Sequence, residues 1–271
     1  MTSPRLNSYF GFTRTPFGRD LAPSMLHRHA SFEQAAARTA WCVNERAIGV
    51  ITGEVGVGKT AAVRSVLTTL DPSRNTVIYL PNPAVGVRGI HFAIVTALGG
   101  APAHHTAALI PQTAEALAAE HHERGKTPII CLDEAHLLTH QQLEAIRMLT
   151  NHDMDSSSAC AVLLLGQPTL KRQMRLGILA ALEQRILLRY TMTGMTAAET
   201  ADYIRHHTGL AGRSDTLFSD DAANLIHETG RGHPRQVNKL AVTALTAAFA
   251  ENKAIVDESS VRAAIIEMTT D

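Results

Sequence analysis

One glycine-rich stretch of this sequence has the residue types and the spacing that bind phosphate. It fits the pattern G-x-x-x-x-G-K-[ST], with one further glycine inside it. A polyphosphate needs several main-chain N–H groups on one concave loop, and a Cβ there would block its approach. Lys59 then brings a positive charge to the β- and γ-phosphates, and the Thr60 hydroxyl can ligate Mg²⁺. The predicted nucleotide-binding residues are Gly53, Glu54, Val55, Gly56, Val57, Gly58, Lys59 and Thr60. The alternative is a chance glycine-rich turn.

A pair of carboxylates follows a continuous apolar run at residues 129–132. Asp133 and Glu134 come directly after this run, and buried carboxylates are costly unless a cation or a reacting water uses them. With a phosphate loop upstream, we predict that Asp133 steadies the Mg²⁺ shell through water and that Glu134 polarises the attacking water. The alternative is that the pair caps a helix at residues 141–151. The letters D-E-A-H also label a helicase family, but its other motifs are not found in the sequence, so His136 receives no role.

Polar side chains also follow the next apolar run, at residues 159–165. Gln167 stands just beyond it, where a side chain can sense the γ-phosphate or hold the water; a plain turn residue is the alternative. Lys171, Arg172 and Arg175 then form a basic helical face. This face is either a nucleic-acid contact or an ordinary solvated surface.

The elements that must position these residues alternate between strand and helix up to Gly194. Short apolar runs predict strands at residues 47–52, 76–80, 129–132, 159–165 and 186–192. Helical periodicity and stop signals predict helices at residues 31–44, 63–70, 90–98, 113–124 and 141–151. After Gly194 the pattern consists of helices alone, with start signals at Thr196, Ser219 and Pro234.

This pattern predicts an α/β P-loop NTPase with a parallel sheet flanked by helices, followed by a small all-helical lid. We expect an N-terminal arm and helix at residues 1–45, the ATPase core at residues 46–194 and the lid at residues 195–271. Residues 1–28 are expected to be loop-like, with their aromatic side chains packed onto the core.

Composition narrows the class of protein further. The 271 residues carry 25 basic and 25 acidic side chains, so nucleic-acid binding would need a local patch or an oligomer that repeats one. The three cysteines are far apart, which argues against a disulfide framework or a zinc site. Adjacent histidine pairs, such as His206–His207, are expected at the surface rather than on a metal. No apolar run approaches membrane-spanning length and no signal peptide is evident, so we expect a cytoplasmic protein.

Taken together, these motifs and the Gly-x-Pro-Arg sequence at residues 232–235 resemble the AAA+ ATPases. The resemblance implies ATP and Mg²⁺ as cofactors and a homo-oligomer, either a ring or a helical filament. It also implies that Gln167 is sensor 1 and that Arg235 is sensor 2, reaching the γ-phosphate from the lid. Arg185 looks like the arginine finger that acts on a neighbouring subunit's nucleotide, with Arg189 as the other candidate.

A narrower likeness concerns the ExeA (GspA) family, which is close to the TniB and MuB transposition ATPases. The residues that carry it are Tyr9-Phe10-Gly11-Phe12, Pro16-Phe17, the phosphate loop, Leu165-Gly166-Gln167-Pro168 and the run from Gly232 to Asn238. Secretion members carry a transmembrane segment and a peptidoglycan-binding region after the ATPase domain. The sequence given ends at Asp271 with neither, and we therefore expect a free-standing ATPase.

Such relatives resemble transposition helpers, which bind target duplex DNA as ATP-dependent oligomers and recruit or stimulate a transposase. By that resemblance Arg88, Lys171 and Arg172 are candidate DNA contacts, with Arg88 expected in a loop after the second strand. Two alternatives stay open. One is an ExeA-like ATPase that assists the assembly of a secretion or envelope machine through protein partners, and the other is a signalling or defence ATPase of the same fold.

Overall fold

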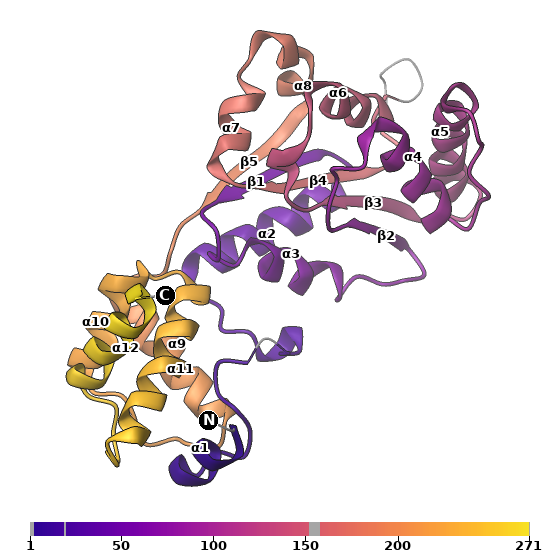
Figure 1. The fold of residues 1–271 in the computed structure, drawn as a ribbon. Helices are drawn as coiled ribbons and strands as arrows, with labels where there is room; N and C mark the ends of the chain where they lie inside the picture. The colour runs from indigo at the N-terminus through magenta and orange to yellow at the C-terminus, as the bar shows by residue number, and fades with distance from the viewer. Residues whose placement is uncertain (1–2, 19, 152–157, 271) are drawn as a thin grey trace. The chain divides into compact units, whose positions relative to one another are not determined.

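The computed structural model describes residues 3–18, 20–151 and 158–270. The chain divides into two compact units, each described here by itself (Figure 1). The α/β unit contains Glu33–Glu54 and Lys59–Met192. The helical unit contains Met1–Phe32, Val55–Gly58 and Thr193–Asp271. The middle of the phosphate loop therefore groups with the helical unit, while its two ends belong to the α/β unit.

A five-stranded parallel sheet forms the centre of the α/β unit, as the sequence predicts. Its strands are β1 Ile48–Gly53, β2 Asn75–Leu80, β3 Thr127–Leu132, β4 Ala161–Gly166 and β5 Ile186–Met192, in the spatial order β2-β3-β4-β1-β5. Every residue of β1 and β4 is buried, which is why these strands read as continuous apolar runs. The edge strands β2 and β5 carry exposed residues between buried ones.

Helices cover both faces of this sheet, as Figure 1 shows, with α2 and α3 on one face and α6, α7 and α8 on the other. The helices are α2 Ala30–Asn44, α3 Lys59–Leu67, α4 Gly86–Ala97, α5 Thr106–His122, α6 His140–Leu149, α7 Pro168–Met174 and α8 Ala180–Arg185, with 3-10 turns η2 Ala135–Leu137 and η4 Gly177–Leu179. Apolar side chains from β1–β5 and from α4 to α8 share one buried core. The fold class predicted from the sequence is confirmed.

Helix α6 begins with a side-chain cap of its own. The Thr139 hydroxyl accepts from the Gln142 N–H, and the Gln142 side chain accepts from the Thr139 N–H, which is a complete capping box. The alternative that Asp133 and Glu134 cap this helix is therefore wrong. Glu134 precedes η2 and makes no side-chain capping bond there.

Four consecutive helices build most of the helical unit, in agreement with the predicted lid. They are α9 Ala197–Leu210, α10 Asp220–Gly230, α11 Pro234–Ala250 and α12 Glu258–Thr270. Thr196 caps α9 with a capping box that includes Glu199, and Ser219 caps α10, so the predicted start signals act as expected.

The N-terminal segment differs from the loop that the sequence predicts. It contains a helix, α1 Ser3–Phe10, and a 3-10 turn, η1 Pro23–Met25. Phe10, Phe12 and Phe17 are buried in the core of the helical unit together with apolar residues of α9 to α12. The aromatic side chains of this segment therefore pack onto the predicted lid rather than onto the α/β core.

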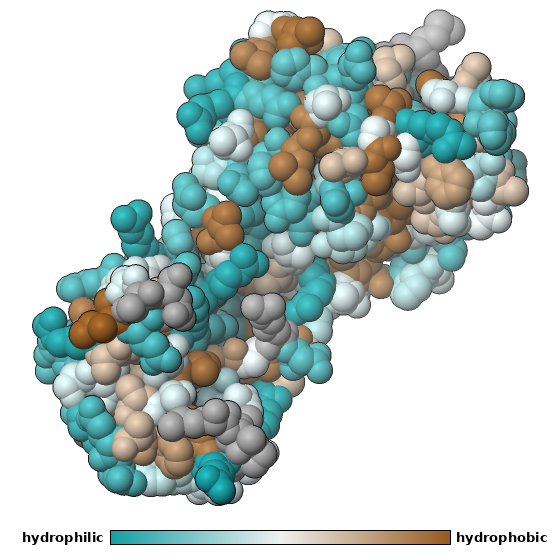
Figure 2. Space-filling view, viewed as in Figure 1, coloured by the Kyte–Doolittle hydropathy of each residue, from teal (hydrophilic) through white to brown (hydrophobic). Residues whose placement is uncertain are grey.

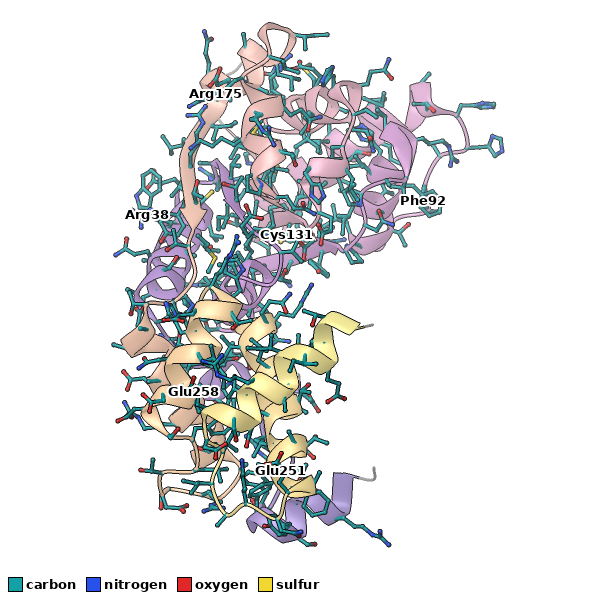
Figure 3. The ribbon with its side chains drawn as sticks, turned by 60° about the vertical axis from the view of Figure 1, so that its left-hand side comes forward. Arg38, Phe92, Cys131, Arg175, Glu251 and Glu258 are labelled. Carbon is teal, nitrogen blue, oxygen red and sulfur yellow. The ribbon has the colours of Figure 1, made fainter. Side chains whose placement is uncertain are left out.

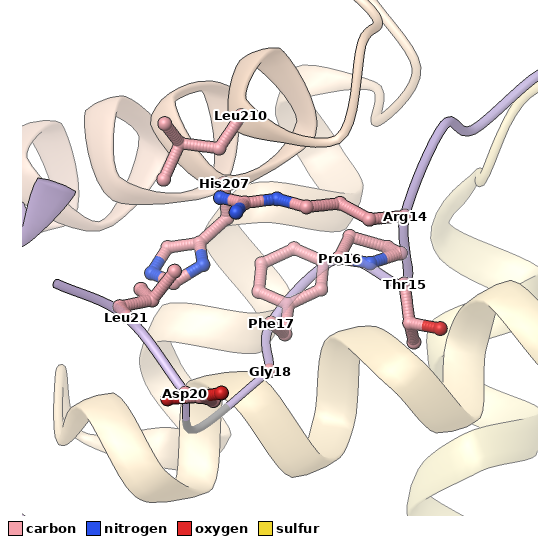
Figure 4. A pocket seen from close by; sticks show the side chains of 9 residues that line it. All are labelled: Arg14, Thr15, Pro16, Phe17, Gly18, Asp20, Leu21, His207 and Leu210. Carbon is pink, nitrogen blue, oxygen red and sulfur yellow. The ribbon is translucent and has the colours of Figure 1, made fainter.

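A histidine cluster fastens this N-terminal segment to α9. The Phe17 ring stacks on His207, with centroids 5.2 Å apart, and both residues line a hollow that Figure 4 shows from close by. His206 Nε2 lies 2.8 Å from the Met25 carbonyl oxygen. The expectation that His206–His207 is a surface pair is wrong for His207, which is only 3% exposed. Burial lowers the pKa of His207 to about 4.

The surface in view mixes polar and apolar residues. Figure 2 shows hydrophobic residues on this face only in separate small patches among hydrophilic ones. Among the residues that the structure describes, no helix has both the length and the hydropathy of a membrane span.

Candidate nucleotide-binding site

The phosphate loop has the backbone conformation that its glycines allow. Gly56 and Gly58 adopt φ values of +82° and +101°, a region that residues with a Cβ rarely enter. Between them the Val57 side chain is fully buried, which anchors the loop. Lys59 closes the loop from its other end, because its Nζ donates to the carbonyl oxygens of Gly53 at 2.8 Å and Glu54 at 2.9 Å. The side chain that we predict for the β- and γ-phosphates is thus held against the loop.

The two predicted Mg²⁺ residues touch each other. Thr60, in the first turn of α3, donates from its hydroxyl to Asp133 Oδ2 at 2.7 Å. Asp133 follows β3, and its side chain is mostly buried. Strands β1 and β3 are not neighbours, so this contact depends on their carboxyl ends meeting at one edge of the sheet.

Tyr79 is a residue of this site that sequence reasoning missed. It lies near the end of β2, and its hydroxyl donates to the same Asp133 Oδ2 at 3.1 Å. The contact follows from register, because Tyr79 pairs with Cys131, two residues before Asp133. Partial burial, followed by the charge of Asp133, raises the pKa of Tyr79 to about 12. The phenol is therefore a permanent hydrogen-bond donor to the carboxylate at neutral pH.

Glu134 stands in an unusual backbone conformation beside this carboxylate. Its φ and ψ of 52° and 34° are left-handed, which costs a non-glycine residue about 1–2 kcal/mol. The Glu134 N–H donates to Asp133 Oδ1 at 2.9 Å, which helps to hold that turn. The carboxylate itself is half-exposed, and its Oε2 lies 3.4 Å from His136 Nδ1 without the geometry of a hydrogen bond. His136, which received no role from the sequence, is thus the neighbour of the predicted base.

The strand order places Gln167 between the two motifs. Strand β4 lies between β1 and β3, and Thr52 pairs with Gly166. Gln167 therefore leaves the sheet level with Gly53, on the side where the Asp133 turn also lies. It caps the N-terminus of α7 through its backbone alone, so its side chain is not used as a helix cap.

Arg185 lies at the other end of the sheet. It ends α8 just before Ile186, and Ile186 pairs with Ile48 at the start of β1. The phosphate loop begins at Gly53, at the opposite end of the same strand. A six-residue strand is about 20 Å long, which is more than an arginine side chain can span. Arg185 Nη1 donates to Thr150 Oγ1 at 3.1 Å. Within one chain, Arg185 therefore does not reach the phosphates bound by its own loop.

Arg189 and Arg235 have other surroundings. Arg189, on β5, donates to the Glu183 carbonyl oxygen at 2.6 Å and lies 3.8 Å from the Glu183 carboxylate. Within the helical unit, the Arg235 N–H donates to the Gly56 carbonyl oxygen at 3.2 Å. A Cβ on Gly56 would lie only 2.7 Å from the Arg235 Cβ, so a side chain at this loop position would displace α11. This close approach is a second reason for glycine at position 56.

The candidate DNA contacts are exposed but do not form one surface. Arg88 lies in the first turn of α4 rather than in the expected loop, and its guanidinium donates to the His104 carbonyl oxygen at 3.2 Å. Lys171 lies on α7 and Arg175 follows it directly as the C-cap residue, and both line one hollow. Arg172, one helical step of about 100° from Lys171, does not line that hollow.

The oxygen atoms at this edge suit Mg²⁺. This ion prefers hard oxygen ligands and usually keeps waters and phosphate oxygens in its shell, with only one or two protein groups. The Thr60 hydroxyl and the Asp133 carboxylate, 2.7 Å apart at the end of the loop, supply such a pair. Elsewhere in the described part of the chain, no group of three or more His, Cys, Asp or Glu residues could hold a metal ion.

Comparison with known proteins agrees with this geometry. Residues 43–174 match a family model described as "AAA domain". The chain is 30% identical over 247 residues to General secretion pathway protein A of Aeromonas hydrophila, an alignment that covers 89% of this chain and 44% of that protein. The chain thus spans less than half the length of this curated relative.

Solved structures share the fold at low identity. Cdc6p from Pyrobaculum aerophilum has a TM-score of 0.70 at 16% identity, covering 96% of this chain and 70% of that chain. The Aeropyrum pernix ORC2 protein has a TM-score of 0.68 at 19% identity, covering 93% and 70%. The ORC1 protein of the same organism, in complex with DNA, has a TM-score of 0.60 at 18% identity, covering 92% and 66%. The chain therefore contains an AAA domain within a P-loop fold followed by C-terminal helices.

Proposed function

We propose that this chain is an ATP-hydrolysing AAA+ regulator. The observation that carries the proposal is the contact at one sheet edge between Thr60, which follows the loop lysine, and the Asp133 carboxylate. Lys59 and the loop N–H groups bind the β- and γ-phosphates, while Thr60 and Asp133 hold Mg²⁺. The ion, when bound, neutralises negative charge on the phosphates. Glu134 orients a water for attack on the γ-phosphorus and accepts its proton.

The remaining site residues have roles around the γ-phosphate. Gln167 holds the same water or senses the γ-phosphate, and its place between the two motifs supports this role. Arg235 is proposed to act as sensor 2. Arg185 is proposed to complete the site of a neighbouring subunit, and its position at the far end of the sheet supports action between chains rather than within one.

Two substitutions test the hydrolytic mechanism. Lys59→Ala removes the lysine of the phosphate loop, so nucleotide binding or hydrolysis should be abolished. Glu134→Gln should keep ATP bound while hydrolysis falls by about 10²–10⁴, the usual contribution of a positioned base. Glu115→Gln, the same change on the exposed face of α5, is the control. ATP binding and turnover would be measured on all three variants, and a Glu134→Gln protein that hydrolyses at the parent rate would remove Glu134 from the mechanism.

We further propose that the regulator is a transposition helper, which binds duplex DNA as an ATP-dependent oligomer and recruits or stimulates a transposase. The motifs that resemble the ExeA family, for which we expect closeness to the TniB and MuB ATPases, motivate this proposal, and the fold shared with an ORC1 protein that is described in complex with DNA is compatible with it. A second candidate is an ExeA-like ATPase that assists a secretion or envelope machine. The 30% identity to General secretion pathway protein A favours this candidate.

Duplex binding separates the two candidates. One subunit carries no net charge and should bind DNA weakly, whereas an ATP-assembled oligomer sums many phosphate contacts. Affinity measured with ATP, with ADP and without nucleotide across a salt series should rise with ATP and fall steeply with salt. Replacing Arg88, Lys171 and Arg172 together should flatten the salt dependence. If ATP brings no gain in DNA affinity at any salt concentration, the secretion-type function is preferred.

A further inference from the structure

A hollow of about 250 Å³ lies on the α7-covered face of the sheet, beside its edge strand. Val50 pairs with Arg189 and Thr52 with Thr191, so these four side chains leave the same face of β1 and β5 and form the floor. Helix α7 forms one wall and Glu183 of α8 forms another. The lining residues are Val50, Thr52, Lys171, Met174, Arg175, Glu183, Arg189, Tyr190 and Thr191.

Positive charge dominates this lining. Three cations, Lys171, Arg175 and Arg189, face one carboxylate, that of Glu183, which leaves an excess of two positive charges (three minus one). Glu183 lies 3.8 Å from Arg189, and within the described residues neither Lys171 nor Arg175 forms an ion pair. Figure 3 labels Arg175 at the side of the unit where α7 and β5 lie. The like charges repel one another, and an anion between them would relieve that repulsion.

Two further features indicate the kind of anion. The floor carries the hydroxyl group of Thr191, which can donate to a bound oxyanion; the Thr52 hydroxyl, 3.1 Å away, donates to the Tyr190 carbonyl oxygen. Arginine forks and a lysine ammonium are the side chains that bind phosphate oxygens most strongly. A water takes up about 30 Å³, so the hollow has room for one phosphate group with several waters.

We propose that this hollow is a second phosphate site of the chain, separate from the nucleotide loop. Lys171, Arg175 and Arg189 bind the phosphate oxygens from three directions. The phosphate belongs either to free inorganic phosphate or to a phosphodiester of nucleic acid. The inference does not depend on ATP hydrolysis. Of the predicted basic face it uses Lys171 and Arg175, and it adds Arg189.

Chemical modification of lysines tests the site directly. Full-length protein would be treated with an amine-reactive reagent, with or without inorganic phosphate or a short DNA duplex, and each lysine followed by mass spectrometry. Phosphate should slow modification of Lys171 by about tenfold at saturation, as expected when charge-assisted bonds hold the ammonium. Lys239, exposed on α11, is the internal control, and Lys59 reports the nucleotide loop separately. Potassium chloride at equal ionic strength controls for general screening.

Two neighbouring arginines supply matched variants. Arg175→Ala should raise the phosphate concentration that half-protects Lys171 by about tenfold, whereas Arg172→Ala, on the same helix but outside the hollow, should change it less than about twofold. The two ligands identify the source of the phosphate. If duplex DNA protects Lys171 at a lower concentration of phosphate groups than inorganic phosphate does, the ligand is nucleic acid. If only inorganic phosphate protects Lys171, the ligand is the free ion. The proposal is overturned if chloride protects Lys171 equally, if the two variants behave alike, or if Lys171 is not protected at all.

Discussion

The Asp133 carboxylate is held by three donors, and their geometry fixes how it can meet a cation. The Thr60 and Tyr79 hydroxyls share Oδ2, and the Glu134 N–H donates to Oδ1. Because both oxygens are engaged, the carboxylate has little rotational freedom. The Tyr79 hydroxyl comes from β2, whereas the other donors lie on α3 and in the turn after β3, so this bond ties β2 to the site.

Removing the Tyr79 hydroxyl should weaken Mg²⁺ use without weakening nucleotide binding. One hydrogen bond contributes about 0.5–1.5 kcal/mol, so Tyr79→Phe should raise the Mg²⁺ concentration for half-maximal hydrolysis by roughly two- to tenfold. The pKa of Tyr79 is raised to about 12, so the effect should be constant from about pH 7 to pH 10. ATP turnover would be titrated with Mg²⁺ at several pH values, and ATP binding measured in a chelator. Tyr190→Phe, the same change on β5, is the control, and an unchanged Mg²⁺ requirement in Tyr79→Phe would refute the role.

The phosphate loop and the Asp133–Glu134 pair could be predicted because their chemistry lies in contiguous residues. Tyr79 could not, because its contact depends on which strands are neighbours and in what register. An aromatic residue near the end of an apolar run was the only signal, and it is equally typical of an edge strand. The sequence also did not show that Arg175 lines a hollow and Arg172 does not, because this depends on how α7 packs beside β5.

At the scale of elements, the contact between the N-terminal segment and α9 is sensitive to acid. The pKa of His207 is lowered from 6.5 to about 4 in the folded protein, so the folded state binds fewer protons than the unfolded state between these values. Stability should therefore be full above about pH 6.5 and fall as the pH drops toward 4. The loss is roughly 3 kcal/mol, at about 1.4 kcal/mol for each pH unit.

This loss would be measured as hydrogen exchange of the α9 amides between about pH 7 and pH 4.5, after correction for intrinsic exchange rates. His207→Leu should flatten the dependence on pH, because the buried group no longer takes up a proton on unfolding. His105→Gln, at an exposed position, is the control and should keep the parent dependence. A His207→Leu protein with the parent slope would assign the acid sensitivity to other groups.

Element boundaries show where local sequence was a good guide. The bounds of β5 agree with the prediction at both ends, because Arg185 and Thr193 flank its apolar pattern. Helix α5 begins seven residues before the predicted start at Thr113 and contains Pro111, a residue that local sequence patterns disfavour inside a helix. Helix α1 was missed because eight residues with a proline give too short a pattern, and its stability comes from packing on distant helices.

For the molecule as a whole, we expect activity that depends on assembly. If Arg185 completes a neighbour's site, turnover per subunit should rise with protein concentration. Arg185→Ala should lose about 10³–10⁵ in rate, as in related phosphoryl-transfer systems. Mixing this variant with Lys59→Ala should restore activity at hybrid interfaces, where an intact loop meets an intact Arg185. The same mixing with Arg189→Ala tests the other candidate, and absence of rescue at any ratio would indicate that Arg185 only anchors α8 through Thr150.

Because the first aromatic residues pack against the last helices, the N-terminal segment cannot complete its folding until the end of the chain has been synthesised. The Tyr9 and Phe249 rings meet edge to face with centroids 5.0 Å apart, and these residues are 240 positions apart in the chain (249 − 9). A ribosome that adds about 5–20 residues per second needs roughly 12–48 s to make that stretch. The α/β unit, whose last strand ends at Met192, is complete well before then. Until α9 to α12 have been made, the nascent N-terminus exposes Phe10, Phe12 and Phe17 without the partners that these helices supply, so it is the part of the nascent chain that molecular chaperones have reason to cover.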